Sequence, residues 1–291
     1  MQEYPGIEME ERGGDLLLRG VRDLDLRQTL DGGQAFRFSE QPDGSFAGVA
    51  RRRKLRVRLD GDVLTVFDAP LSDAAVWLDY FDLARDYGAI ARALSAAHPS
   101  LAAACERARG VRVLRQDGWE ALCTFILSQN NNIPRIKGLV ARLCECFGGE
   151  LAPDTYDFPS PQRLAACAQE DLAPVRAGFR AAYVLDAARR VASGEIDLDA
   201  LRVMPYGDAA GTLRRIKGVG PKVADCALLY GFGRMEAFPR DVWINRAVAT
   251  LFGEAGLPDC ARESAGIAQQ FLFAYARAEK IGVEARAKKD A

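Results

Sequence analysis

Apolar runs and alternating segments characterise residues 1–108 of the chain. Leu16-Leu17-Leu18-Arg19 is a short apolar run, and Leu55-Arg56-Val57-Arg58-Leu59 alternates between apolar and basic positions. An alternation with a period of two is typical of a half-buried strand. Asp60-Gly61-Asp62 is a turn signal, and the apolar run Val63-Leu64-Thr65-Val66-Phe67 follows it. This part of the chain is therefore predicted to be antiparallel β structure with some helix.

From about Gly110 onward the apolar positions follow a helical period, with Gly, Pro, Asn and Asp at the joints. Asp117-Gly118-Trp119-Glu120 indicates a helix start, because Asp caps free amides and Glu three residues later can reach back, as in a capping box. This helix is expected to run to Gln129 and break at Asn130-Asn131-Asn132. We expect an α+β protein, with an N-terminal antiparallel β-sheet domain over residues 1–108 and a mainly helical region over residues 109–291.

The composition argues against a disordered chain and against a membrane-spanning one. With 49% hydrophobic and 27% charged residues it is that of a globular chain, and no apolar run reaches the roughly 18 residues of a membrane helix. The first residues lack the basic start and apolar stretch of a signal peptide. The seven cysteines form no framework pattern, which favours reduced thiols. We expect a cytoplasmic protein without a membrane partner, associated with the nucleoid if bacterial.

The net charge of −1 does not point to a nucleic-acid partner, but bulk charge misses local clusters. Arg51-Arg52-Arg53-Lys54, together with Arg56 and Arg58, is one such cluster. We interpret it as the solvated face of a strand, which is the usual meaning of a charge run.

The segment from Leu213 to Cys226 carries the strongest local signal. One helix is expected to end near Lys217, and Gly218 and Gly220 let the backbone turn tightly and approach another molecule. Pro221 then suits the first position of the next helix. Free amides at such a turn, backed by the positive end of a helix, can hold a phosphate, as in a helix-hairpin-helix element on DNA. An ordinary joint between two helices remains the alternative.

Lys222 and Asp241 are the candidate reacting groups. Lys222 falls in the first turn of the expected helix, where the helix dipole disfavours a cation and so favours the neutral, nucleophilic amine. A lysine that contacts a phosphate is the alternative. Asp241 is placed as the N-cap of a further helix after Phe238-Pro239-Arg240. Capping and catalysis are compatible, because a capping carboxylate is fixed and kept ionised.

The hairpin, the lysine and an aspartate nineteen residues later (241 − 222) resemble the helix-hairpin-helix glycosylase superfamily, in particular the 8-oxoguanine DNA glycosylase/AP lyase family. Four segments carry the resemblance: Gly32–Arg37, Val111–Asp117, Ser128–Ile136 and Gly218–Cys226. The anchors span roughly residues 30–275. The resemblance implies a DNA repair enzyme that flips out 8-oxoguanine, removes it preferentially opposite cytosine through a lysine Schiff base, and cuts the strand by β-elimination.

The resemblance also implies roles for single residues and an active site in a cleft between helical subdomains. Lys222 would attack the sugar C1′, with support from Asp241. The lesion base would lie against Gly33, Cys226, Gln269 and Phe273. The remaining residues would contact the opposite cytosine (Asn130, Arg135, Arg180) or a DNA phosphate (Lys217, Gly218, Val219, Gly220), with the hairpin spanning about residues 210–232.

Three positions depart from the animal members of the family. Trp243 stands where they have a phosphate-holding histidine, Phe179 replaces a tyrosine, and Pro221 replaces a threonine-like residue. These changes leave the lysine chemistry intact but weaken the expected phosphate clamp and the strictness of the choice of opposite base.

We expect no cofactor and no metal in the active site. The last two cysteines, Cys226 and Cys260, are too far apart for the iron–sulfur cluster of some relatives, and Cys144-Glu145-Cys146 is too tight for a zinc pair. We leave open whether the hairpin binds a structural cation. The expected partner is double-stranded DNA with an oxidised purine, bound by a monomer. Two rival interpretations are a monofunctional glycosylase for alkylated bases, which would lack Lys222, and a non-enzymatic DNA-binding hairpin module.

Overall fold

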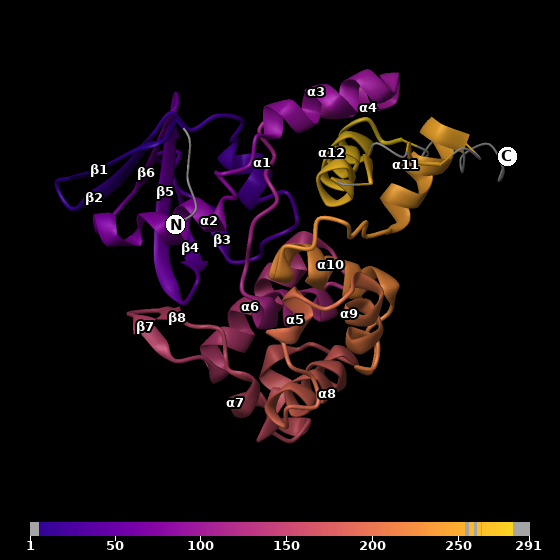
Figure 1. Cartoon of the computed structure of the whole chain (residues 1–291). Coiled ribbons are helices and arrows are strands. Elements are labelled where there is room, and N and C mark those ends of the chain that lie inside the picture. Colours follow the sequence, from indigo (N-terminus) through magenta and orange to yellow (C-terminus); the bar gives the residue numbers. More distant parts are fainter. Residues whose placement is uncertain (1–5, 254–255, 259–260, 263, 282–291) are drawn as a thin grey trace, which may run out of the picture.

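A computed structural model describes residues 6–253, 256–258, 261–262 and 264–281. An antiparallel sheet occupies one side of the molecule, and the helices from α5 to α10 lie beneath and beside it (Figure 1). The α+β architecture predicted from the sequence, a β-sheet domain followed by a helical region, is confirmed.

The sheet has six strands in the order β1-β2-β6-β5-β4-β3, all paired antiparallel. The strands are β1 (Glu8–Arg12), β2 (Asp15–Arg19), β3 (Phe38–Glu40), β4 (Phe46–Ala50), β5 (Arg53–Asp60) and β6 (Val63–Val66). Asp60 pairs with Val63, so the expected turn signal closes the β5–β6 hairpin. The three strands predicted from apolar runs and alternation are thus β2, β5 and β6.

One face of the sheet carries the N-terminal core, because every second residue of a strand points the same way. Leu16, Leu18, Leu55, Val57 and Leu64 have at most 1% of their surface exposed. They pack in one cluster with the helices α1 (Leu26–Leu30) and α2 (Ala74–Tyr80), which a short 3-10 turn, η1 (Leu71–Asp73), precedes.

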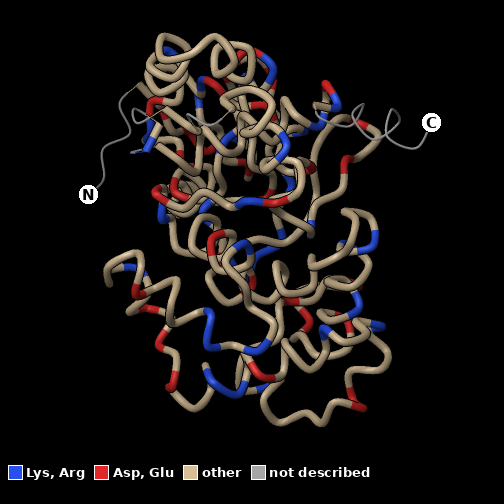
Figure 2. Tube along the Cα trace, turned by 90° about the vertical axis from the view of Figure 1, so that its right-hand side faces the viewer, with Lys and Arg blue, Asp and Glu red and all other residues tan. Residues whose placement is uncertain are grey.

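Ion pairs neutralise the five arginines of the basic cluster at residues 51–58. Arg51 pairs with Asp79 at 2.7 Å, Arg52 with Asp157 at 2.7 Å, and Arg58 with Asp60 at 2.7 Å, while Arg53 and Arg56 pair with Asp73 and Asp43. Such exposed pairs contribute little stability. They agree with the solvated-face interpretation, and acidic and basic residues are scattered along the whole trace (Figure 2).

The remaining elements are almost all helical. They are α3 (Tyr87–Ala97), α4 (Pro99–Arg107), α5 (Gly118–Leu127), α6 (Ile133–Phe147), α7 (Pro161–Ala165), α8 (Arg180–Ala192), α9 (Tyr206–Leu213), α10 (Pro221–Phe232), α11 (Val242–Phe252) and α12 (Ala265–Ala278). A small hairpin of β7 (Glu150–Ala152) and β8 (Thr155–Tyr156) and the 3-10 turns η2 (Glu170–Val175) and η3 (Ala200–Arg202) complete the described part. None of the described helices is long and apolar enough to cross a bilayer.

The two hydrophobic cores interleave around the expected domain boundary at residue 108. Leu94, Leu101 and Ala104, from α3 and α4, belong to the helical core, where α4 packs on α12. Leu114, which comes later in the chain, belongs to the core of the sheet. The boundary at 108 stays a prediction, whereas the packing assigns α3 and α4 to the helical side.

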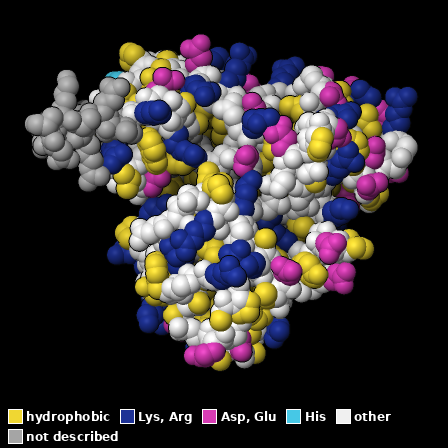
Figure 3. Space-filling view, turned by 180° about the vertical axis from the view of Figure 1, so that it is seen from behind, with side chains coloured by type: hydrophobic (Ala, Val, Ile, Leu, Met, Phe, Trp, Pro, Cys, Tyr) yellow, Lys and Arg dark blue, Asp and Glu magenta, His cyan; other side chains and the backbone are white. Residues whose placement is uncertain are grey.

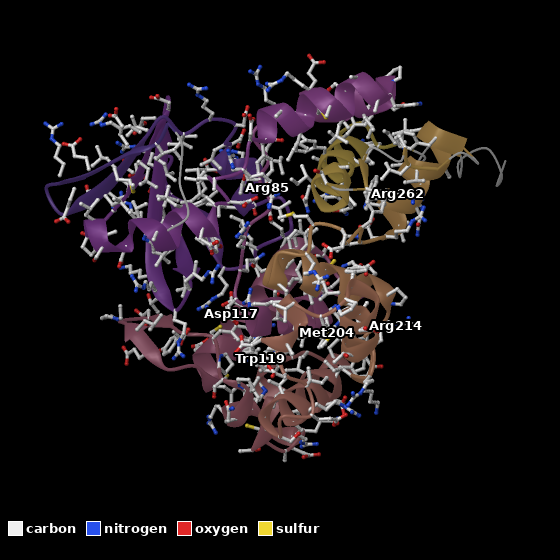
Figure 4. The ribbon with its side chains drawn as sticks, in the orientation of Figure 1. Arg85, Asp117, Trp119, Met204, Arg214 and Arg262 are labelled. Atoms are coloured by element: carbon white, nitrogen blue, oxygen red, sulfur yellow. The ribbon has the colours of Figure 1, made fainter. Side chains whose placement is uncertain are left out.

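Helix α5 begins where the sequence placed it. The Asp117 side chain accepts a hydrogen bond from the Glu120 amide at 2.9 Å. The Glu120 carboxylate pairs with Arg37 at 3.2 Å instead of completing a capping box. Figure 4 shows Asp117 and Trp119 at this helix start, between the sheet and the lower helices. The ion pair therefore ties α5 to the loop before β3.

Candidate active site

The hairpin between α9 and α10 presents Lys222. Gly218 has φ +78°, and a Cβ there would stand 2.1 Å from a ring carbon of Tyr183, so only glycine fits. Gly220 is extended, with φ −90° and ψ −178°, and a Cβ there would meet nothing within 4 Å. Pro221 opens α10 as predicted, which puts Lys222 in its first turn. Arg214, just after α9, marks the start of this hairpin in Figure 4.

The Lys222 amine contacts Phe125 of α5 and Ser128, the residue at the C-terminal end of that helix. Nζ of Lys222 lies 3.4 Å from Oγ of Ser128 and 5.3 Å from the centroid of the Phe125 ring. The hydroxyl orients the amine, and the aromatic face of Phe125 lies beside it, an arrangement that attracts an ammonium group. Lys222 is half-buried and faces both a groove and a pocket.

Asp241 faces the same pocket and the same groove as Lys222. It is the N-cap of α11, and its Oδ1 accepts a hydrogen bond from the Ile244 amide at 2.8 Å. The predicted cap is confirmed. Because one oxygen is fixed by the helix start, the carboxylate is held beside the pocket in one orientation.

The structure brings together all four residues expected around the lesion base. Gly33, Cys226, Gln269 and Phe273 line one pocket with Lys222 and Asp241, with about 320 Å³ of empty volume that includes space open to solvent. Gly33 has φ +96°, and a Cβ there would stand 3.1 Å from Cδ1 of Ile133 and 3.9 Å from Phe273. The backbone therefore approaches the pocket closely at a position that favours glycine.

Gln269 offers an unused acceptor in this pocket. The side chain is 4% exposed, and its Nε2 donates to the Pro239 carbonyl at 3.2 Å. Its Oε1 is buried and has no hydrogen-bond partner within the described part of the chain. A buried acceptor without a partner costs about 1–3 kcal/mol, so a ligand that donates a hydrogen bond here would be favoured.

Cys226 is a wall of the pocket and a poor nucleophile. Burial raises the pKa of its thiol to about 11, although the nearby positive charge of Lys222 acts in the opposite direction. The thiol therefore stays protonated at neutral pH, which makes it a weak nucleophile.

Sequence reasoning missed four further pocket residues, one of which is Pro239. Phe125 and Tyr230 stack with ring centroids 5.1 Å apart, and the Gln270 amide donates to the Tyr230 hydroxyl. All three line the pocket. Phe125 and Tyr230 lie on apolar helix positions that look like ordinary core, so the sequence carries no signal to single them out.

The groove outside the pocket contains the 128–132 loop on one side and Arg240, Trp243 and Asn245 on another. Asn130, with φ +46°, is exposed at the tip of the loop. Trp243, one of the departures from the animal members, is half-buried at the groove wall.

Arg180 supports the tip of this loop from beneath. Its Nε donates to the Gln129 carbonyl at 2.7 Å and its Nη2 to the Asn130 carbonyl at 3.1 Å. Burial, followed by the charge of nearby Arg135, lowers the pKa of the Arg180 guanidinium. Arg180 is thus engaged with the backbone, whereas Arg135 is exposed. Phe179, 51% exposed, covers the Arg180 guanidinium at 4.4 Å.

The four residues expected to hold a phosphate are not equivalent. The Lys217 amide donates to Asp186 at 2.8 Å, and the Val219 amide donates to the Ile216 carbonyl at 3.0 Å. These two amides serve the fold, and Val219 is buried. Gly218 and Gly220 are exposed, so the glycines are the residues with backbone open to an anion.

Among the described residues, no group of three or more His, Cys, Asp and Glu side chains could hold a metal ion. Cys260 lies outside the described residues. His98 caps α4, where its Nδ1 accepts a hydrogen bond from the Ser100 amide at 3.1 Å, and it packs on Phe252.

Two family models together match residues 16–265. One is described as the N-terminal domain of 8-oxoguanine DNA glycosylase and matches residues 16–122. The other is described as the HhH-GPD superfamily base excision DNA repair protein and matches residues 123–265. A protein of Methanothermobacter thermautotrophicus named "Probable N-glycosylase/DNA lyase" is 30% identical over 88% of this chain and 95% of its own length. The chain belongs to the 8-oxoguanine DNA glycosylase family of N-glycosylase/DNA lyases.

Two solved structures of this family have the same architecture. A structure of MBOgg1 in complex with a low-affinity DNA ligand is 42% identical, with a TM-score of 0.88 over 94% of this chain and 99% of that one. The Clostridium acetobutylicum 8-oxoguanine glycosylase/lyase, in complex with double-stranded DNA containing cytosine opposite 8-oxoguanine, is 34% identical with the same score and coverage. The family predicted from the hairpin, the lysine and the aspartate is confirmed.

Proposed function

We propose that this protein removes 8-oxoguanine from duplex DNA, preferentially opposite cytosine, and then cuts the strand at the same site. The proposal rests on one observation. Lys222 and Asp241 line the same pocket, next to Oε1 of Gln269, an acceptor without a hydrogen-bond partner in the described residues. A base stacked in a duplex cannot enter such a pocket, so the nucleotide must first be flipped out of the helix.

Lys222 carries the chemistry of both steps. Its neutral amine attacks C1′ of the sugar, the bond from C1′ to the base breaks, and the base leaves with the electron pair and takes up a proton. The nitrogen then loses one proton, the bond from C1′ to the ring oxygen O4′ breaks, and O4′ takes up a proton. The sugar ring is thereby opened, and a protonated imine joins Nζ to C1′. Removal of a proton from C2′ then breaks the bond from C3′ to the phosphate. Asp241 stabilises the positive charge that develops on the sugar.

The lining of the pocket supports a proposal for how the lesion is recognised. Guanine N7 is an acceptor, whereas in 8-oxoguanine N7 carries a hydrogen and becomes a donor. A Gly33 carbonyl aimed at N7 attracts the lesion and repels guanine. The buried Oε1 of Gln269 requires a donor, which the N–H groups on the pairing edge of a guanine-type base supply.

The 128–132 loop and its neighbours suit the opposite base. Arg135 is exposed and offers guanidinium donors, which match the N3 and O2 acceptors of an unpaired cytosine. Asn130 supplies an acceptor for the amino group of the cytosine. Arg180 holds the Asn130 backbone in place, and any direct contact with the base requires it to leave those carbonyls.

The partner that we propose is double-stranded DNA with an oxidised purine, bound by a monomer in the cytoplasm. The chemistry assigned above needs an amine and a carboxylate and no cofactor. A structural cation at the hairpin stays a prediction.

Borohydride trapping on a duplex with a single 8-oxoguanine tests the proposal. We expect a covalent adduct of protein and DNA, because borohydride reduces the imine. Base release without an adduct would favour a monofunctional glycosylase. Binding with neither base release nor an adduct would favour a DNA-binding module.

A further inference from the structure

Gln34, which follows Gly33 in the chain, is a buried polar residue in a loop. It is 1% exposed, although it belongs to neither a helix nor a strand. Its Nε2 donates to the Arg112 carbonyl at 2.7 Å, and its Oε1 accepts from the Leu114 amide at 2.9 Å. Its own backbone carbonyl accepts from Nε2 of Gln116 at 2.7 Å. The residue therefore makes three hydrogen bonds to one short segment, which we call the strap, residues 111–116.

The side chain of Gln34 pairs with the strap as a neighbouring strand would. A primary amide has a donor and an acceptor in one plane, like a peptide group. It donates to the carbonyl of one strap residue and accepts from the amide two residues later, which is a strand-like pattern. In addition, the Gln116 side chain donates a hydrogen bond to the Gln34 backbone carbonyl. The two glutamines thus fix the Gln34 side chain and the Gln34–Ala35 peptide to the strap, directly after the Gly33 carbonyl in the chain.

The strap is itself fixed at both ends. The Arg112 guanidinium donates to the carbonyls of Asp82 at 2.6 Å and Arg22 at 2.8 Å. At the other end, the Gln116 amide donates to the Tyr230 carbonyl at 2.7 Å. Tyr230 lies on α10, the helix that carries Lys222 in its first turn. A continuous chain of short contacts therefore joins the lesion-reading loop to the nucleophile.

We propose that Gln34, clamped by Gln116, is a positioning residue that sets where the Gly33 carbonyl stands relative to Lys222, and so sets the discrimination between 8-oxoguanine and guanine. This inference rests on the proposed function. If the Gly33 carbonyl distinguishes 8-oxoguanine from guanine, its position must be fixed. A displacement of about 1 Å in an active site can change rates by about 100-fold. Gly33 lacks a side chain that could fix it, so the next residue supplies the anchor.

The test replaces each glutamine by methionine, which has a similar length but no amide. Gln34→Met removes both strap bonds, whereas Gln116→Met removes only the clamp on the Gln34 carbonyl. Gln41→Met is the matched control, because Gln41 makes a local bond to the Ser39 carbonyl at 3.1 Å. For each purified protein, single-turnover release of 8-oxoguanine is compared with borohydride trapping on a preformed abasic site, which presents no base to Gly33.

We expect base release to fall by at least about 30-fold in Gln34→Met and by about 10-fold in Gln116→Met, while abasic-site trapping changes by less than about threefold. The ratio of 8-oxoguanine to guanine release should fall in both, and Gln41→Met should behave as the unaltered protein. Because Gln116→Met keeps the Gln34 bonds, it stays informative if Gln34→Met does not fold.

An equal fall in base release and in trapping would mean that the glutamines only support the fold, and an unchanged ratio of 8-oxoguanine to guanine release would also overturn the proposal. Failure of the unaltered protein to release 8-oxoguanine is a separate result, which would reject the proposed function itself.

Discussion

Lys222 is set apart from other lysines by its surroundings: the first turn of α10, the Ser128 hydroxyl at 3.4 Å and the Phe125 ring. If its amine forms the imine, Lys222→Gln should abolish borohydride trapping and base release, while binding to lesion DNA stays within about threefold. Lys54→Gln, at an exposed position on β5, is the matched control and should trap normally. Gel analysis of the adduct and a binding titration measure the two effects, and full excision by Lys222→Gln would reject the assignment.

Asp241 has two roles that one substitution can separate. Asn caps helices about as well as Asp, so Asp241→Asn should leave the melting temperature within a few degrees. Loss of its charge should slow base release by about 100-fold or more. Asp86→Asn is the control, because Asp86 caps α3 in the same way, through the Ala89 amide at 2.7 Å. A near-normal rate in single-turnover assays of Asp241→Asn would leave capping as its sole role.

Cys226 provides a pH-dependent check on the choice of nucleophile. Because burial raises its pKa to about 11, only about one thiol in a thousand is ionised at pH 8. Iodoacetamide should therefore modify the exposed Cys146 first, with Cys226 reacting only as the pH approaches 11. Mass spectrometry of the folded protein measures both sites. Cys226→Ser should still be trapped by borohydride, and labelling of Cys226 as fast as Cys146 at pH 7.5 would contradict its assignment as an inert wall.

The sequence predicted single residues correctly where the local backbone conformation requires a particular residue type. Gly33, Gly218, Pro221 and the cap Asp241 each have a conformational reason to be what they are. Glu120 shows the opposite case: the capping-box pattern predicted a bond to its own helix start, but Arg37, 83 positions away in the sequence, pairs with it instead. Long-range partners of this kind leave no trace in the spacing of neighbouring residues.

Within the helix-hairpin-helix element, the two glycines do different things. Gly218 has φ +78° and lies against the Tyr183 ring, so Gly218→Ala should destabilise the protein by about 1–3 kcal/mol. Gly220→Ala has open space around it and should leave the melting temperature unchanged. In the proposed function a phosphate approaches this backbone, and an added Cβ would obstruct it. We therefore expect DNA affinity to fall by about 10-fold, as for one lost hydrogen bond.

Gly207→Ala in α9 is the control for the hairpin, since a Cβ there also meets nothing within 4 Å. Thermal melting and salt-dependent DNA titration of the three variants separate stability from binding. Unchanged affinity in Gly220→Ala would show that the hairpin does not hold a phosphate at this residue. The sequence indicated the hairpin as a unit but treated both glycines alike, because spacing does not reveal which one has the left-handed backbone.

At the scale of the molecule, the sequence predicted a sheet followed by helices but not which distant segments pack together. Periodicity describes one segment at a time, whereas the helical core packs α4 on α12, more than 150 positions later in the chain. The pocket likewise combines distant segments, since Gly33 comes from the N-terminal part and Phe273 from α12. The view from behind shows acidic and basic side chains interspersed over the surface, in keeping with the small net charge (Figure 3).

In the proposed function, the choice of the opposite base depends on the whole molecule. The 128–132 loop and Arg135 contact one DNA strand, while Lys222 contacts the other. Adenine would leave cytosine-directed donors unpaired, at about 1–3 kcal/mol for each buried group, so release of 8-oxoguanine should be at least about 10-fold faster opposite cytosine than opposite adenine. Arg135→Ala should reduce that ratio to within about threefold, whereas Arg12→Ala, on the exposed strand β1, should preserve it. Single-turnover assays on the two duplexes give the ratio. Equal rates for the unaltered protein, or an unchanged ratio in Arg135→Ala, would show that the opposite base is read elsewhere.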